Sequence, residues 1–104
     1  MKNITTQTEL NEILSTSAYT ILKFGATWCG PCQQIAPIFE AASQKHPEVT
    51  FVSVDVDDAQ ELAGQLGIQQ VPTMLFFKQS ALINNICGPV SETLLDEAID
   101  RYFV

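Results

Sequence analysis

The sequence predicts an α/β fold in which a central mixed β-sheet is sandwiched between α-helices. Segments with helical spacing of apolar residues alternate with segments of strand-like spacing, as expected for strands connected by helices. The last two expected strands are joined by a short polar turn, which adds an antiparallel pair and makes the sheet mixed. The chain has 104 residues, of which 46% are hydrophobic and 16% charged, so we expect a single globular domain over residues 1–104.

Each element in the first half of the chain has its own signal. Thr6-Gln7-Thr8-Glu9 fits a capping box at the start of a helix. Residues 19–26 are apolar on both alternating faces except at Lys23, which is typical of a central strand covered on both sides. The following helix, over residues 31–45, contains Pro37, which is expected to kink it.

The second half of the chain is interpreted in the same way. Residues 50–56 alternate as a strand, and Asp57-Asp58 is expected to start a helix that Asp58 caps. Gln79-Ser80 is a polar turn between two short strands, and Ser91 caps a final amphipathic helix. The expected elements are helix 6–15, strand 19–26, helix 31–45, strand 50–56, a helix that stops at Gly64 or Gly67, strands 73–78 and 82–87, and the helix after Ser91.

The charge balance excludes several classes of function. The net charge of −7 argues against a nucleic-acid groove or an anionic membrane surface, since both need clustered Lys and Arg. The first seven residues lack the apolar core of a signal peptide, and no apolar run is long enough to span a bilayer. We therefore expect a cytoplasmic protein that binds neither nucleic acid nor membrane. Without an exposed apolar stripe, we expect a monomer.

The most informative segment is Trp28-Cys29-Gly30-Pro31-Cys32, because two thiols separated by Gly-Pro can close into a disulfide and reopen. Proline suits the first turn of a helix, which places Cys29 at or just before the helix N-terminus. The unpaired N–H groups and the dipole there favour a thiolate. Cys32, one turn further in, is expected to be more shielded. The pattern predicts that one thiol attacks and the other resolves.

The motifs around this pair extend along most of the chain. In order, they are residues 26–32, Ile35-Ala36-Pro37, Val54-Asp55-Val56-Asp57, Val71-Pro72-Thr73, Phe76-Phe77-Lys78 and Gly88. A bare Cys-x-x-Cys occurs in many proteins, but the whole set in this order resembles the thioredoxin family.

The resemblance implies the thioredoxin fold and a protein-disulfide reductase activity. Cys29 would attack a client disulfide and Cys32 would resolve the mixed disulfide. Gly30-Pro31 favours the reducing direction, because oxidases and isomerases of this fold carry histidine between the cysteines. The resemblance also implies recharging by a flavoprotein thioredoxin reductase that uses NADPH, with no cofactor bound to the chain itself.

A docking surface for disulfide-containing client proteins is implied in the same way. The Val71-Pro72 bond would be cis beside the two sulfurs, and the Val71 backbone would pair with extended client backbone. The apolar surface would consist of Trp28, Gly30, Pro31 and the Gly88 loop. Two alternatives remain: Trp28 as core packing, and Pro72 as an ordinary trans turn proline.

Lys23 departs from the family pattern, which has a buried aspartate at this place. A lysine there is either desolvated, which lowers its pKa, or turned toward water or a carboxylate such as Asp55 or Asp57. A neutral Lys23 could accept the proton of Cys32, whereas a charged Lys23 would stabilise the Cys32 thiolate. Either role makes Lys23 an active-site neighbour, and the charged form predicts a less reducing protein.

A second departure from the family pattern lies on the neighbouring strand. Ser53 replaces a residue that is charged in many relatives.

The remaining candidates have simpler explanations. Cys87 is either a small apolar residue at a strand end or a reactive thiol at the rim of the site. His46 is expected to be a solvated turn residue rather than a base. The acidic residues Asp55, Asp57 and Asp58 do not all share one face of a strand, which argues against a metal site built from them. A zinc site from the three cysteines and His46 lacks the usual second close pair of ligands.

Two classes of function are consistent with these features. The first is the reductase. The second is a binding or redox-regulatory module of the same fold with weak reductase activity, because Lys23 replaces the usual aspartate. Replacing both Cys29 and Cys32 by serine separates the two, since a binding module would keep its function.

Overall fold

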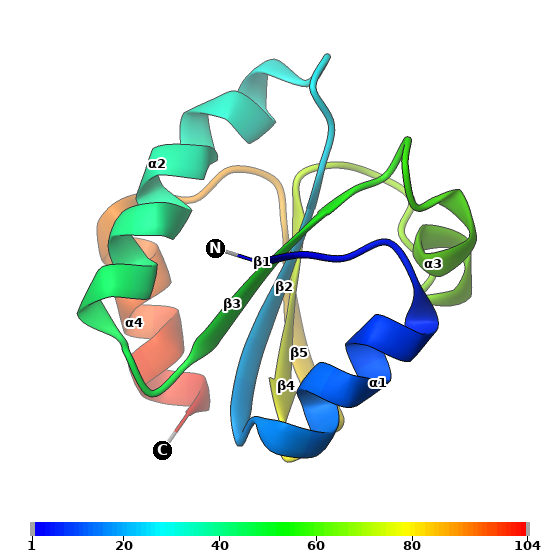
Figure 1. The fold of residues 1–104 in the computed structure, drawn as a ribbon. Helices are drawn as coiled ribbons and strands as arrows, with labels where there is room; N and C mark the ends of the chain where they lie inside the picture. The colour runs from blue at the N-terminus through cyan, green and yellow to red at the C-terminus, as the bar shows by residue number, and fades with distance from the viewer. Residues whose placement is uncertain (1, 104) are drawn as a thin grey trace.

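The computed structural model describes residues 2–103 and contains a five-stranded sheet flanked by four helices (Figure 1). The sheet order is β1-β3-β2-β4-β5. The elements in chain order are β1 (Lys2–Asn3), α1 (Gln7–Thr16), β2 (Tyr19–Gly25), α2 (Gly30–Lys45), β3 (Thr50–Asp55), α3 (Gln60–Gln65), β4 (Thr73–Lys78), β5 (Ala81–Cys87) and α4 (Glu92–Tyr102). No helix of this described range is both long and apolar enough to cross a membrane.

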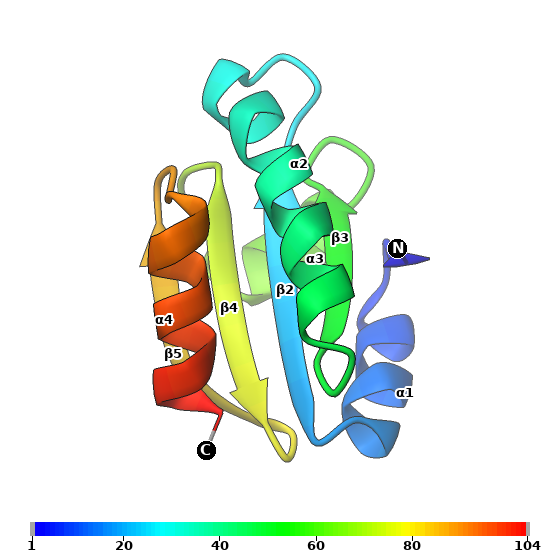
Figure 2. The same ribbon diagram turned by 90° about the vertical axis from the view of Figure 1, so that its left-hand side faces the viewer.

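The layers are those expected from the sequence. Helices α1 and α3 cover one face of the sheet, and α2 and α4 cover the other (Figures 1 and 2). Strand β2 lies at the centre, parallel to β3 and antiparallel to β4, while β4 and β5 form an antiparallel hairpin. The mixed sheet is thus confirmed. The sequence did not predict β1, a two-residue edge strand parallel to β3, because two residues are too few to show the alternation of a strand.

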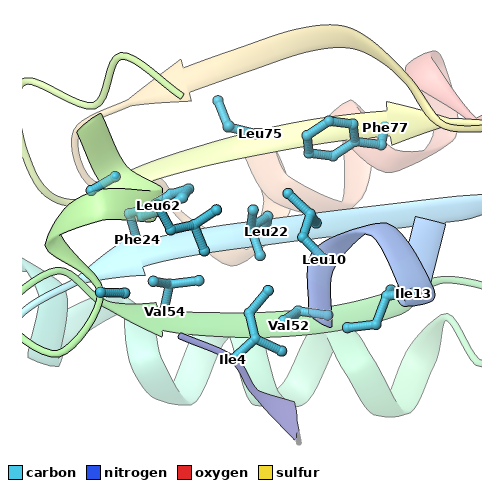
Figure 3. Close-up of a cluster of buried hydrophobic side chains, with 12 residues drawn as sticks. Ile4, Leu10, Ile13, Leu22, Phe24, Val52, Val54, Leu62, Leu75 and Phe77 are labelled. Atoms are coloured by element: carbon cyan, nitrogen blue, oxygen red, sulfur yellow. The ribbon is translucent and has the colours of Figure 1, made fainter. Parts of the chain in front are cut away.

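Alternation along β2 sends its side chains into two separate cores. Leu22 and Phe24 lie in the cluster under α1 and α3, which Figure 3 shows, together with residues of β3 and β4. Ile21 lies in the other cluster, with Phe39 of α2 and residues of α4. Lys23 shares the parity of Ile21, so it points toward α2. The strand register therefore puts a lysine beneath the helix that carries the cysteine pair.

Two of the predicted helix starts are confirmed. The Thr6 hydroxyl accepts the N–H of Glu9 at 3.2 Å, and the Glu9 carboxylate accepts the N–H of Thr6 at 3.2 Å, which completes the capping box. Ser91 accepts the N–H of Leu94 at 3.1 Å at the start of α4. Each cap satisfies N–H groups that would otherwise lack a partner.

The predicted start of α3 is wrong. Its N-cap is Ala59, without a side-chain hydrogen bond, rather than Asp58. The carboxylate of Asp55 accepts the N–H of Asp57 at 2.9 Å, and the carbonyl of Asp55 accepts the N–H of Asp58 at 3.1 Å. The chain after β3 therefore closes into a turn, and the helix begins only after this turn.

The interpretation of His46 as a solvated turn residue is also wrong. His46 is the half-buried C-cap of α2, and its Nε2 lies 3.1 Å from Oδ1 of Asp96 in α4. Lys45 adds contacts to Glu92 at 2.6 Å and to Asp96 at 3.1 Å. These side chains join the C-terminal end of α2 to α4, at the opposite end of a 16-residue helix from the cysteines. His46 is therefore part of a structural network.

We predict that truncating Leu22 to alanine destabilises the fold by about 3 kcal/mol, because it removes a fully buried side chain from the central strand. Leu82 in β5 is the matched control: its side chain is 52% exposed, and Leu82→Ala should change the free energy of unfolding by less than about 0.5 kcal/mol. Urea unfolding of both variants checks this. Equal losses for the two would contradict the assignment of the core.

Candidate active site

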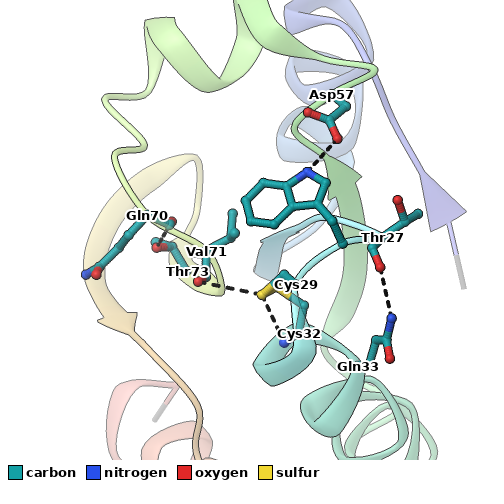
Figure 4. The surroundings of a disulfide bond; sticks show 9 residues. Thr27, Cys29, Cys32, Gln33, Asp57, Gln70, Val71 and Thr73 are labelled. Atoms are coloured by element: carbon teal, nitrogen blue, oxygen red, sulfur yellow. Dashed lines mark hydrogen bonds between the residues drawn. A yellow bond between two sulfur atoms is a disulfide. The ribbon is translucent and has the colours of Figure 1, made fainter.

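The first turn of α2 holds the cysteine pair. Cys29 is the N-cap residue, with extended backbone angles, and its Sγ accepts the N–H of Cys32 at 3.2 Å (Figure 4). Pro31 lies in the first turn, where its missing N–H costs nothing, as the sequence predicted. The Cα atoms of Cys29 and Cys32 are 5.2 Å apart, and their sulfurs form a disulfide. The pair is therefore close enough to form a disulfide within one turn of α2.

The expectation that Cys32 is more shielded than Cys29 is wrong. Their exposed fractions are 7% and 6%, so burial does not distinguish them. Their surroundings do. The sulfur of Cys29 receives the helix N–H and lies 3.8 Å from the carbonyl oxygen of Val71. The sulfur of Cys32 lies beside Gly25, where an added Cβ would be only 3.5 Å away.

This difference assigns the two thiols to different tasks. A thiolate at Cys29 keeps the helix N–H bond and gains charge assistance, so the helix start favours its ionised form. Because the thiolate is the nucleophile, Cys29 is suited to attack a client disulfide. Cys32 points back toward β2 and is suited to the second, internal step.

The loop before β4 lies against Cys29. The Val71-Pro72 bond is cis, so the alternative of an ordinary trans proline is wrong. The carbonyl of Pro72 accepts the N–H of Gly88 at 2.8 Å, and the Thr73 hydroxyl donates to the carbonyl of Gln70 at 2.8 Å. Gly88 has a φ of 93°, a left-handed conformation that glycine adopts without strain. These bonds hold the Val71 backbone beside the sulfur of Cys29.

Trp28 is not core packing, because 69% of its surface is exposed. Its indole N–H donates to Oδ2 of Asp57 at 2.8 Å, and the ring belongs to the residue directly before Cys29. Gly30 and Pro31 are exposed as well. The sequence did not reveal the role of Asp57, because the bond joins residues 29 positions apart in the chain. This carboxylate fixes an apolar ring at the edge of the reactive pair.

Lys23 lies under the pair. It is half-buried, and its amine lies 5.0 Å from the centre of the Phe39 ring. Burial lowers the pKa of Lys23 below the usual lysine value. The suggested pairing of Lys23 with Asp55 or Asp57 is wrong, because no such ion pair forms within residues 2–103. Asp55 instead accepts the N–H of Asp57, and Asp57 accepts the indole N–H of Trp28. The sequence could not identify Phe39 as the group that contacts the amine.

The other candidates lie outside this arrangement. Cys87 ends β5 opposite Thr73, is exposed, and its thiol lies 3.8 Å from Oδ1 of Asn85. Its position at a strand end is confirmed, while its reactivity stays a prediction. Residues 2–103 contain no group of three or more His, Cys, Asp or Glu side chains that could hold a metal ion.

A reversible cysteine pair at a helix N-terminus, beside a cis-proline loop, defines a thiol–disulfide oxidoreductase. The family model described as Thioredoxin matches residues 1–101, and the chain belongs to the thioredoxin family. Proteins of this family are protein-disulfide reductases that need no bound cofactor.

Known proteins agree with this assignment over almost the full length. The chain is 38% identical to a thioredoxin of Mycoplasmoides gallisepticum, over 95% of this chain and 99% of that one. It is similar in structure to Plasmodium falciparum thioredoxin, with a TM-score of 0.90 at 32% identity, covering 98% of this chain and 99% of that one. Fasciola hepatica thioredoxin gives a TM-score of 0.90 at 36% identity with the same coverage.

We predict that Lys23→Met raises the free energy of unfolding at neutral pH by about 1 kcal/mol, because it removes a partly desolvated charge. The pKa of Lys23 is lowered in the folded state, so the unfolded chain binds more protons between that lowered pKa and the ordinary value of 10.5. The advantage of methionine is therefore full below this window and shrinks as pH rises through it.

Urea unfolding at a series of pH values measures this effect. Lys2→Met, at an exposed edge position, is the control and should show no such trend. A Lys23→Met variant that is less stable than wild type at neutral pH, or whose advantage is the same at every pH, would contradict the desolvation of this amine.

Proposed function

We propose that the chain is a general reductase of protein disulfides, in which Cys29 attacks the client and Cys32 releases it. The observation that carries this proposal is the hydrogen bond from the N–H of Cys32 to the sulfur of Cys29, because it stabilises the thiolate of the attacking residue. The exposed Trp28 also supports attack by Cys29, since it leaves an apolar surface beside the Cys29 sulfur on which a client could dock.

The reaction proceeds in two exchanges. The Cys29 thiolate attacks one sulfur of the client disulfide, forming a mixed disulfide and releasing the other client sulfur as a thiolate, which takes up a proton. The Cys32 thiolate then attacks Sγ of Cys29, forms the Cys29–Cys32 disulfide and releases the second client thiolate, which is also protonated. Two electrons pass from the cysteine pair to the client.

Client recognition would use backbone and shape. The half-buried Val71 has its carbonyl 3.8 Å from the sulfur of Cys29, so an extended client strand paired with Val71 would bring its own sulfur into line. Trp28, Gly30, Pro31 and the Gly88 loop supply a surface with little charge. Pro72 is buried and would act by fixing this loop rather than by direct contact. Such a surface favours many clients over one.

The partners and the compartment belong to the same proposal. The oxidised pair would be recharged by a thioredoxin reductase that takes its electrons from NADPH, so the chain would be an electron carrier. The net charge of −7 supports a protein that binds no nucleic acid or anionic membrane surface. We place it in the cytoplasm as a monomer. Reducing conditions in that compartment suit a disulfide that must be reopened.

We predict that the protein reduces insulin disulfides when coupled to thioredoxin reductase and NADPH, and that Cys29→Ser lowers the rate to background. Cys32→Ser should accumulate a mixed disulfide with the client, because the resolving thiol is missing. NADPH consumption and mass spectrometry of the trapped product measure the two effects.

Cys87→Ser is the control, because this thiol does not take part in the pair, and it should keep the wild-type rate. A wild-type protein that does not reduce insulin would contradict the proposal. If its biological function also survived replacement of both Cys29 and Cys32 by serine, the result would instead support a binding module.

A further inference from the structure

Lys23 brings an amine beneath the active-site helix. On β2 it pairs with Ser53 of β3 and Met74 of β4, and its amine lies 5.0 Å from the centre of the Phe39 ring of α2. The electron-rich face of an aromatic ring favours a cation over a neutral amine. The side chain lies between the sheet and α2, where contact with the ring favours its ammonium form.

Cys32 opens onto the same space. A cavity of about 260 Å³, open to solvent, is lined by Lys23 and Cys32 together with Gly25, Ser53 and Asp55. Gly25 and Ser53 leave this room because their side chains are absent or small. A Cβ at Gly25 would lie 3.5 Å from the sulfur of Cys32, so the cavity reaches the sulfur itself. It has room for several water molecules.

The cavity contains little other charge. Its charged and titratable side chains are Lys23, Cys32 and Asp55, and the β1 residue that lines it, Asn3, is uncharged. The carboxylate of Asp55 accepts the N–H of Asp57 and makes no ion pair with Lys23 within residues 2–103. A partly desolvated ammonium group is stabilised by a nearby anion, and reduction of the disulfide can create one at Cys32.

We propose that Lys23 is a positioning residue for the resolving step, in which its ammonium group stabilises the Cys32 thiolate across the cavity that the two side chains share. This inference rests on the roles proposed above for Cys29 and Cys32. The proton of Cys32 passes to solvent through the open cavity. The thiolate then attacks Sγ of Cys29, forms the internal disulfide and breaks the bond to the client sulfur, which leaves with its electron pair.

The same interaction affects the equilibrium. An ammonium group that stabilises a thiolate also stabilises the reduced pair, so the wild-type protein is a weaker reductant than a variant without this charge. A tenfold change in the exchange equilibrium corresponds to about 30 mV for a two-electron couple.

The test is the reaction of the reduced protein with dithionitrobenzoate, an aromatic disulfide that releases a coloured thiolate at each step. A Cys87→Ser background removes the third thiol. With excess reagent, the first phase reports attack by Cys29. The second phase reports resolution by Cys32, and its rate does not depend on reagent concentration.

We expect Lys23→Gln to slow the second phase about tenfold at pH 7 and to leave the first phase nearly unchanged. Its rate–pH profile should move to higher pH and meet the wild-type rate in alkaline solution, where Cys32 is ionised in both proteins. Lys23→Arg should restore most of the rate, because it keeps the charge. Asp55→Asn, which keeps the oxygen that accepts the turn N–H, should leave the second phase close to wild type.

Three results would overturn the proposal: a second phase unaffected by Lys23→Gln, an equal slowing at every pH, and a larger effect from Asp55→Asn. A wild-type protein in which the second phase depends on reagent concentration would show a different failure. In that case Cys32 does not resolve the mixed disulfide, and the roles proposed for the cysteine pair are themselves wrong.

Discussion

The hydrogen bond from the backbone N–H of Cys32 to the sulfur of Cys29 is the interaction on which the site depends. It makes Cys29 the cap of α2, so one sulfur serves both as the end of a helix and as a reactive atom. A helix start offers N–H groups that need an acceptor, and a thiolate satisfies this need better than a neutral thiol. The same hydrogen bond therefore caps α2 and stabilises the thiolate of the attacking residue. The central strand β2 leads the chain into this turn. The loop with the cis bond at Val71-Pro72 lies against it.

Small residues on the sheet beneath α2 leave space next to the cysteine pair. Gly25 and Ser53 lie on the sheet face under α2 and leave a cavity where larger side chains would have filled the core. Lys23 enters this space at the cost of desolvation, with the Phe39 ring as partial compensation. A charge retained in such a place, next to the sulfur that must ionise in the second step, links the packing of the sheet to the chemistry of the pair.

Local patterns in the sequence predicted much of the fold. The caps at Thr6 and Ser91, the alternation in β2 and β3, and the turn at Gln79-Ser80 depend on neighbours a few residues away, and the structure confirms them. The cis bond before Pro72 came from the family resemblance instead.

The errors involve contacts between distant segments or competing local bonds. His46, predicted to be solvated, is held by Asp96, 50 residues away. The exposed position of Trp28 was predicted, but its bond to Asp57, 29 residues away, was not, and no local pattern encodes either pair. Asp58 fails as a cap because Asp55 already closes the turn before it. The position of Lys23 was predictable from alternation, but its contact with Phe39 requires knowing how α2 lies on the sheet.

The helix start makes Cys29 the attacking thiol. Competitive alkylation of the fully reduced wild-type protein tests this assignment, with a limiting amount of iodoacetamide at pH 7 and peptide mass spectrometry to locate the label. We expect Cys29 to be labelled well before Cys32 and Cys87, because its thiolate accepts the helix N–H. Labelling of Cys32 first, or equal labelling of Cys29 and Cys32, would contradict it.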